Sequence, residues 1–474
     1  MALNRLFGTR SCPSLVISWI PLVFLLLTLI SVIAVSGADA VSEIGPWILL
    51  GASALALCLS AVGKVVSRRG IVLGMFRSGA QILPAVPILV CIAMVATSWM
   101  LSGVVPTLIY YGLEILSPRL FLVITCAVCS VISVLTGSSW TTIATIGVAF
   151  MGIGEVMGYS DPWIAGAIIS GAYFGDKVSP LSDTTVVASS TAGVELFKHI
   201  RYLTYTTVPA MLISLGVFFC AGMFSHPGGS VDSAEMLMAL DSTFNITAWT
   251  LVIPVVTLLL IVLRVPTLIV LFVAAMLGAA GIFILQPGLG MEFLSVVSTL
   301  WGGSSLATGN EALDTLVSTG GILGMLPTIY LVLSAMVFGA VMIGTGMLAR
   351  ITDSLTSSLH NRTGIVSATV GSGLAMNCCT ADQYLSLIIT GNMYRSVYRR
   401  FGLEPRLLGR SMEDSISVTS VLIPWNSCGV TQATVLGVST LAYFPYCIFN
   451  ILTPIMSIIV ARIGYKIPQM RLSA

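Results

Sequence analysis

The chain alternates between apolar runs of roughly 20 residues and shorter segments that hold most of its charged side chains. A helix of that length spans the hydrocarbon core of a bilayer, which is about 30 Å thick. The run from Leu15 to Val35 is long enough to span, and too long for the apolar part of a cleaved secretion signal. Because helices satisfy their backbone hydrogen bonds internally, the pattern predicts an all-α polytopic membrane protein.

Charges in the segments between the apolar runs alternate along the chain. Arg5 and Arg10 precede the first run, segment 37–45 has acids and no cation, and segment 64–69 is basic again. Segment 225–245 also lacks Lys and Arg, whereas basic residues return near the C-terminus. Lys and Arg favour the cytoplasmic side. The charges therefore predict a multi-pass inner-membrane protein with both termini in the cytoplasm.

The apolar segment 364–390 does not fit a simple crossing. Arg350 and Arg362 precede it and the basic segment 395–410 follows it, so both of its ends belong on the same side. Polar residues also interrupt its centre, namely Asn377, Thr380, Asp382 and Gln383. We therefore predict a re-entrant hairpin whose tip lies within the membrane, where irregular backbone is tolerated if it lines a cavity or is buried in protein.

Internal identities indicate two similar halves. Leu83-Pro84 matches Leu326-Pro327 with an offset of 243 residues, which also places Gly137 on Thr380. Ser179 matches Ser420 with an offset of 241. Equivalent loops carry opposite charge patterns, as an inverted-topology repeat predicts.

The repeat predicts the same elements in each half, including one re-entrant hairpin and one broken helix. With the hairpins set apart, about ten full transmembrane helices remain. The expected halves are residues 1–232 and 233–474, the hairpins about 119–156 and 363–394, and the broken helices about 162–196 and 411–440.

Composition supports the membrane assignment and excludes other classes. The 474-residue chain is 56% hydrophobic and only 8% charged, whereas soluble domains are about 25% charged. It has no basic tract, which argues against nucleic-acid binding. Its cysteines and histidines lack zinc-site spacing, and there is no Ser/His/Asp arrangement. We therefore expect neither an enzyme nor a resident cofactor.

The first broken helix carries a polar cluster in an otherwise apolar stretch. Pro180 interrupts the helix and leaves carbonyl groups free. Hard oxygen ligands of the kind that small cations prefer are then available from Asp176, Ser179, Ser182, Asp183 and Thr184. Lys177 is expected to neutralise Asp176 or to hold an anion. The alternative is an ordinary loop at the membrane surface.

The second half offers a matching set of oxygen ligands. Pro424 predicts an unwound centre beside Asn426, and the hairpin tip supplies Asn377, Thr380, Asp382 and Gln383. Desolvation at mid-membrane favours a protonated carboxyl at Asp382, and a neighbouring cation favours the ionised form. A cation and a proton would then compete for one site. The alternative is that Asp382 only caps the hairpin helix.

Two further groups are assigned simpler roles. Glu413 and Asp414 follow Arg406 and Arg410, and we expect them at the cytoplasmic interface as salt-bridged anchors or gate residues. His199 falls in a predicted loop and is expected to carry no function.

These clusters resemble motifs of the NhaC family of Na⁺/H⁺ antiporters. The similar stretches are Gly171-Ala172-Tyr173-Phe174-Gly175-Asp176-Lys177, residues 179–185, Asp382-Gln383-Tyr384-Leu385-Ser386, Glu413-Asp414 and residues 422–429. Members similar to this family exchange Na⁺ for H⁺, or carry organic anions such as malate or lactate. The wider resemblance, to the ion-transporter superfamily, implies paired hairpins and broken helices, and suggests a homodimer. One departure is Ser420-Val421-Leu422, where the family tends to have Ser-Pro-Leu.

The resemblance favours Na⁺/H⁺ exchange by alternating access, with Li⁺ as a further candidate ion and the lipid bilayer as a partner. Asp183, Asp382 and Asn426 are the predicted Na⁺ ligands. The alternative is an organic-anion exchanger coupled to Na⁺ or H⁺, in which Lys177 and helix N-termini would hold a carboxylate.

Overall fold

The computed structural model describes residues 13–37, 40–62, 85–224, 233–263, 265–306, 308, 313–314, 317–356 and 361–466. These residues are largely helical, and an isolated antiparallel bridge pairs Ser304 with Thr319. The cations at positions 5, 10, 64, 68 and 69, which carried part of the topology argument, lie outside the described residues, as does the Leu83-Pro84 match.

The first half contains long helices interrupted at three places. Its elements are α2 (Leu15–Ser36), α3 (Ala40–Val62), α5 (Ala85–Leu101), α6 (Val104–Ile115), η1 (Pro118–Leu120), α7 (Phe121–Thr136), α8 (Ser139–Thr142), the π-helical turn η2 (Ile143–Gly147), α9 (Val148–Val156), α10 (Asp161–Val178), α11 (Asp183–Ala192) and α12 (Leu196–Phe224).

The second half begins with peripheral helices and then follows a similar order. Its elements are α13 (Ser233–Thr243), η3 (Ala248–Leu251), α14 (Val252–Val262), α15 (Thr267–Leu285), η4 (Pro287–Leu289), α16 (Phe293–Gly302), α18 (Gly321–Gly324), α19 (Leu326–Gly344), α20 (Met347–Thr356), α21 (Arg362–Thr380), α22 (Gln383–Arg400), α23 (Pro405–Met412), the π-helical turn η5 (Glu413–Ser417), η6 (Ser420–Leu422), α24 (Ser427–Leu436), α25 (Thr440–Tyr443), η7 (Phe444–Tyr446) and α26 (Ile448–Ile463).

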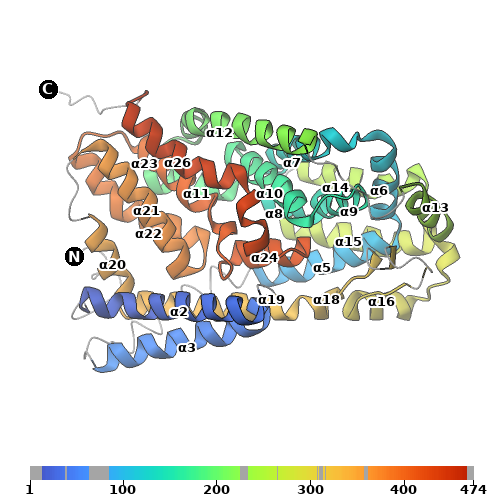
Figure 1. Ribbon diagram of the computed structural model, residues 1–474, viewed down its shortest axis with the longest axis horizontal. Helices are drawn as coiled ribbons and strands as arrows, with labels where there is room; N and C mark the ends of the chain where they lie inside the picture. Colours follow the sequence, from blue (N-terminus) through green and yellow to red (C-terminus); the bar gives the residue numbers. More distant parts are fainter. Residues whose placement is uncertain are drawn as a thin grey trace.

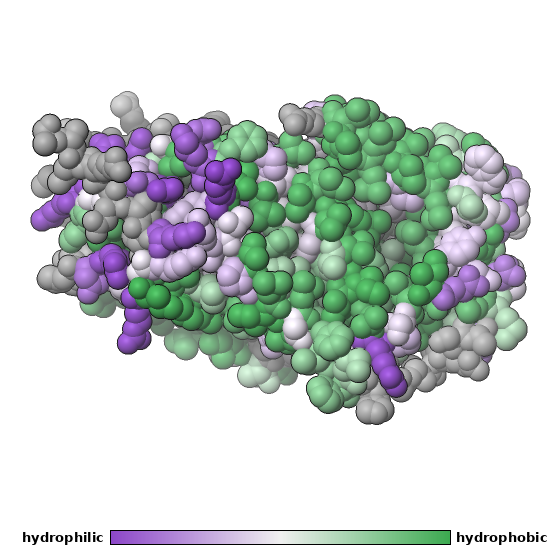
Figure 2. All heavy atoms as spheres, turned by 90° about the horizontal axis from the view of Figure 1, so that it is seen from above, coloured by the Kyte–Doolittle hydropathy of each residue, from purple (hydrophilic) through white to green (hydrophobic). Residues whose placement is uncertain are grey.

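Seven described helices are long and apolar enough to cross a membrane, and three bent helix pairs raise that number to as many as ten. Figure 2 shows a broad apolar belt between two more polar ends of the molecule. The belt, the span lengths and the helical content confirm the prediction of an all-α multi-pass membrane protein.

The interrupted helices lie between outer layers of continuous ones. In Figure 1, α2, α3 and α19 run along one side and α12 lies along the opposite side, where it packs on α26. Between them lie α7, α10, α11 and α24. The described chain starts in α2 and ends after α26 at the same end of the long axis.

The element bounds of the two halves recur with an offset of 244 residues. Helix α11 ends at Ala192 and α24 ends at Leu436, and each is followed by a left-handed glycine. The sequence matches gave offsets of 243 and 241, so the pairing of Gly137 with Thr380 was wrong by one residue. The left-handed Gly137 corresponds instead to the left-handed Ala381.

Close packing of α7 on α10 depends on small residues. A Cβ atom at Gly171 would overlap the carbonyl oxygen of Cys126, and one at Gly175 would overlap that of Ser130. Small residues of this kind let helix backbones approach closely within a membrane.

We expect Gly171→Ala to destabilise the fold by about 1–3 kcal/mol, because the added methyl group overpacks the α7–α10 contact. Gly216→Ala is the matched control, since a Cβ there meets nothing within 4 Å. Thermal unfolding in detergent compares the two variants. An equal unfolding temperature for both would contradict this packing.

Candidate functional site

The tip of the first hairpin is a short irregular link held by side chains. Gly137 ends α7 in the left-handed conformation, and the hydroxyl oxygen of Ser138 accepts the Thr141 amide at 3.2 Å. The Ser138 amide donates to Thr136 Oγ1 at 3.2 Å. A Cβ at Gly137 would lie 2.5 Å from that of Leu181, so the tip sits against the break between α10 and α11.

The second tip repeats this geometry with a carboxylate. Ala381 ends α21 with φ of 56°, and Asp382 Oδ1 accepts the Leu385 amide at 2.8 Å. The Asp382 amide donates to Thr380 Oγ1 at 3.3 Å. The Ser427 amide donates to the Ala381 carbonyl at 2.9 Å, which ties this tip to the break before α24.

Each break is closed by a polar residue that caps the following helix. The hydroxyl oxygen of Ser182 accepts the Thr185 amide at 3.4 Å at the start of α11. Asn426 Oδ1 accepts the Cys428 amide at 3.1 Å at the start of α24. Such caps satisfy amides that a helix start leaves unpaired. Ser182 and Asn426 are related by the same 244-residue offset.

Asp176 joins the first tip to the first broken helix. Ser139 donates to its Oδ2 from the amide at 3.2 Å and from the hydroxyl at 2.7 Å. The Ser182 hydroxyl also hydrogen-bonds this carboxylate, and Asp183 lies within electrostatic range. Asp183 itself is exposed at the start of α11.

Three of the predicted carboxylates act electrostatically on one tyrosine that the sequence reasoning did not single out. Tyr384 lies within electrostatic range of Asp176, Asp183 and Asp382. The sequence could have identified Tyr384 as a site residue, because it follows Asp382 by two positions at the start of α22. No group of three or more His, Cys, Asp or Glu side chains in the described ranges is arranged to hold a metal ion together. A cation here would therefore draw on hydroxyl, amide and backbone oxygens as well.

The other predicted ligands tie the tips to the broken helices. Ser179 donates to the Val134 carbonyl at 2.8 Å, and Thr184 Oγ1 lies 3.0 Å from Ser182 Oγ. The Asn377 side-chain amide donates to the Ile416 carbonyl at 2.8 Å. In turn, Gln383 Oε1 accepts the Ser420 hydroxyl at 3.3 Å, and the Asn426 side-chain amide donates to the Asn377 carbonyl at 3.2 Å.

Lys177 does not pair with Asp176, which corrects one expectation. Neighbouring side chains on a helix point in different directions. Lys177 instead reaches Asp414, and both side chains are buried. Thr206 donates to the same Asp414 oxygen at 3.1 Å, and Arg410 Nε lies 3.9 Å from the other oxygen.

Glu413 and His199 are both fully buried. Glu413 and Asp414 lie in η5, and their role as anchors or gate residues at the cytoplasmic interface stays a prediction. His199 belongs to α12 and is fully buried, so its predicted loop position is wrong. It packs against Gly409, where an added Cβ would come within 2.7 Å of the imidazole.

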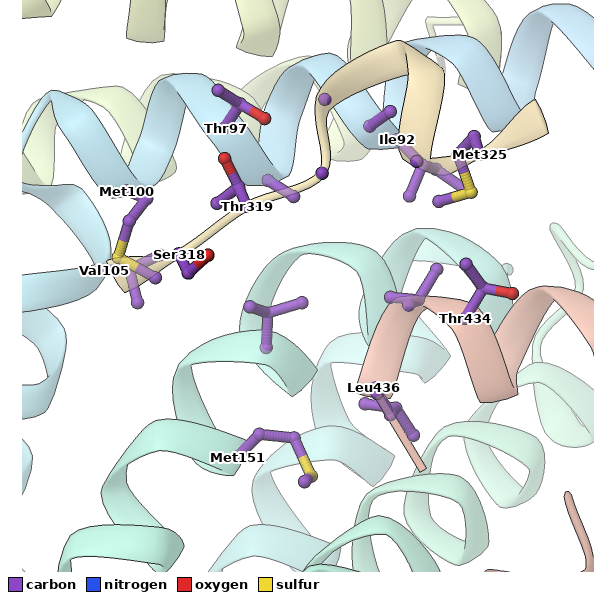
Figure 3. A pocket seen from close by; sticks show the side chains of 18 of the residues that line it. Ile92, Thr97, Met100, Val105, Met151, Ser318, Thr319, Met325, Thr434 and Leu436 are labelled. Atoms are coloured by element: carbon purple, nitrogen blue, oxygen red, sulfur yellow. The ribbon is translucent and has the colours of Figure 1, made fainter. Parts of the chain in front are cut away.

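A cavity of about 370 Å³ opens between α5, α9, the α18 region and the end of α24. Figure 3 shows Thr97, Met151, Thr319 and Thr434 lining it from these four sides. Glu155 is the ionisable residue among those that line it. With the offset of 244 residues, the lining residues Leu436 and Met151 correspond to Ala192 and Arg395 in the opposite halves. Ala192 and Arg395 border a pocket of only 90 Å³.

Interrupted helices, capped hairpin tips and buried charges within an apolar belt define a membrane transport protein of the secondary-transporter class. The sequence profile of the Na⁺/H⁺ antiporter family matches residues 9–206 and 171–465. The chain therefore belongs to the Na⁺/H⁺ antiporter family, which confirms the resemblance drawn from its motifs.

Relatives within the family carry different names. The chain is 39% identical to the Na⁺/H⁺ antiporter NhaC of Alkalihalophilus pseudofirmus, over 80% of this chain and 81% of the relative. It is 38% identical to the malate-2H⁺/Na⁺-lactate antiporter of Bacillus subtilis, over 77% and 78%. It is 35% identical to the arginine/ornithine antiporter ArcD of Halobacterium salinarum, over 81% and 79%.

We expect Lys177→Met to destabilise the protein by about 3–5 kcal/mol, because it leaves Asp414 buried without its ammonium partner. The double variant Lys177→Met/Asp414→Leu should recover much of that loss. Lys198→Met is the control, since its partner Glu195 and Lys198 itself are both exposed. If Lys177→Met unfolds in detergent at the same temperature as Lys198→Met, the buried pair is not formed.

Proposed function

We propose that this chain exchanges Na⁺ for H⁺ across the cytoplasmic membrane by alternating access. The ion site lies where the two hairpin tips meet the two helix breaks. Na⁺ is held there by Asp176 and Asp382, with oxygens of the capping residues completing its shell. Exchange then requires only that Na⁺ and H⁺ be bound in competition.

One observation carries this proposal above the others. Both tips are closed against breaks, and Asp176, Asp183 and Asp382 all lie within electrostatic range of Tyr384. Carboxylates at membrane depth are costly and are retained chiefly at ion and proton sites. The family membership and the similarity to the Na⁺/H⁺ antiporter NhaC of Alkalihalophilus pseudofirmus support the same reading.

The arrangement in the membrane forms part of the proposal. The limbs of the first hairpin reach span length by themselves, so the case for re-entry rests on the contacts of its tip with the interior break. The recurring bounds and the opposite loop charges support an inverted repeat. We place Arg395, Arg399 and both ends of the described chain on the cytoplasmic side.

Organic-anion exchange is the alternative, favoured by the identity to the malate/lactate relative. It needs a free cation at the site, but Lys177 is engaged by Asp414 and is 1% exposed. We therefore rank it second.

The two unequal cavities fit a single conformation of an alternating-access cycle. The larger one opens beside the end of α24, whereas the equivalent position at the end of α11 borders a pocket of only 90 Å³. There the Arg395 guanidinium lies within 2.8 Å of where a Cβ of Gly193 would be. Arg395 thus blocks one route while the other is open.

The function is tested in proteoliposomes with a pH gradient and an internal pH dye. Addition of NaCl or LiCl should collapse the gradient and KCl should not. A response only to sodium malate or sodium lactate would replace Na⁺/H⁺ exchange with the organic-anion alternative.

Asp382→Asn should lower the Na⁺-driven response by about tenfold or more, because a neutral amide loses the charge that binds the cation. Glu195→Gln, at an exposed surface pair, is the control and should behave as the unmodified chain. An unchanged rate and pH profile in Asp382→Asn would remove this residue from the site.

Thiol labelling tests the open and closed routes. Thr434→Cys lines the larger cavity and should react with a polar thiol reagent, whereas Ala192→Cys, at a position 1% exposed, should not. The unmodified chain, with exposed Cys58 and Cys220, sets the background. If Na⁺ or pH never changes the two reactivities in opposite directions, alternating access through these cavities fails.

A further inference from the structure

Glu413 is a fully buried carboxylate for which the tip site provides no role. Neither of its carboxylate oxygens receives a hydrogen bond of normal geometry from any described residue. The nearest donor is the Ser417 hydroxyl, one turn further along the same π-helical segment. A buried carboxylate without donors is strongly disfavoured as an anion, so it calls for a proton or a cation.

Asp382 offers a direct contrast. It accepts the Leu385 amide at 2.8 Å, and the Tyr384 amide and the Ser427 hydroxyl lie close to it. It also stands at the N-terminus of α22, where the helix dipole favours negative charge. Asp382 therefore has a hydrogen-bond donor and a helix N-terminus that stabilise its ionised form, whereas Glu413 accepts no hydrogen bond of normal geometry from the described residues.

The charges around Glu413 do not balance. Lys177, Asp176 and Asp414 all lie within electrostatic range of it, and Arg410 stands beside Asp414. Two cations thus face three carboxylates in the interior. One further positive charge is needed for neutrality, and either H⁺ or Na⁺ can supply it.

Other ionisable groups lie on the elements that pack against η5 or adjoin the cluster. They include Asp183 on α11, His199 and Tyr202 on α12, Arg362, Cys378 and Cys379 on α21, Tyr384, Tyr394, Arg395, Tyr398, Arg399 and Arg400 on α22, and Arg462 near the end of α26. Arg406 is paired with Glu404 at 2.6 Å. Tyr394 and Tyr398 hydrogen-bond Ser372 and Thr369, respectively. Within the cluster, Glu413 is the carboxylate that has no ion pair and accepts no hydrogen bond of normal geometry in the described part of the chain.

We propose that Glu413 carries the proton that is exchanged for Na⁺. With the tip site empty, Glu413 is protonated and the cluster is neutral. When Na⁺ binds beside Asp176, its charge replaces that of the proton, and Glu413 releases H⁺ to the side on which the site is open. Asp176 and Lys177, adjacent in α10, couple the tip site to the interior cluster. This inference rests on the proposed function and assigns its proton.

The test is Na⁺ binding to the purified chain at several pH values, followed with radioactive Na⁺. In the unmodified chain, the apparent affinity should rise about tenfold per pH unit while Glu413 is protonated. Glu413→Gln mimics the protonated form, so its affinity should stay weak and independent of pH. It should also lose Na⁺-driven proton movement in liposomes.

Asp382→Asn is the matched comparison. It should bind Na⁺ weakly but keep the pH dependence, because Glu413 still titrates. If Glu413→Gln merely damages the fold, its Na⁺ affinity should fall by the same factor at every pH, so the pH dependence would remain. Glu413→Gln that retains the pH dependence would overturn the proposal, whereas absence of Na⁺ binding in the unmodified chain would overturn the proposed function instead.

Glu413→Asp keeps the test decisive if Glu413→Gln does not fold. Infrared difference spectra with and without Na⁺ should contain a carboxylic-acid band that Na⁺ abolishes, and this band should shift in Glu413→Asp. An unshifted band would place the proton on another residue.

Discussion

Interrupted backbone within an apolar interior is the constraint on which the rest of this structure depends. Each unpaired amide or carbonyl at such depth costs several kcal/mol, which is a large share of a protein's net stability. At the two tips and the two breaks beside them, the chain meets this cost with one cap each: Ser138, Ser182, Asp382 and Asn426. The caps bring polar oxygens and helix N-termini to one region, so the requirement of folding also supplies the oxygens of the proposed ion site.

The same region is linked to a second group of charges by two adjacent residues. Asp176 faces the first tip through Ser139, while Lys177 turns away to Asp414. A change of charge at the tips therefore changes the electrostatic potential at the interior cluster directly, because Asp176 and Lys177 are adjacent in α10. A buried ion pair gives little net stability by itself. The proposed coupling of Na⁺ to H⁺ gives a functional reason for the Lys177–Asp414 pair.

Much of the framework was predictable because membrane helices impose strong local rules. Pro180, Pro424 and the polar interruption near Asp382 marked the breaks and a tip, and the structure has them there. Pairings across the chain were not predictable. Lys177 and Asp414 are 237 residues apart, and only helix rotation decides that Lys177 avoids its neighbour Asp176. Few identities connect the halves, so the offset was wrong by one residue at the first tip, and the burial of His199 and Glu413 carried no local signal.

Proton release on Na⁺ binding tests the central claim most directly, because it requires neither a membrane nor a gradient. Purified protein in weakly buffered detergent solution would be mixed with NaCl, and the pH change followed with a dye, with KCl as the control. Competition between Na⁺ and H⁺ predicts release of about one proton per chain on Na⁺ and none on K⁺. Saturable Na⁺ binding with no proton release at any pH would contradict it.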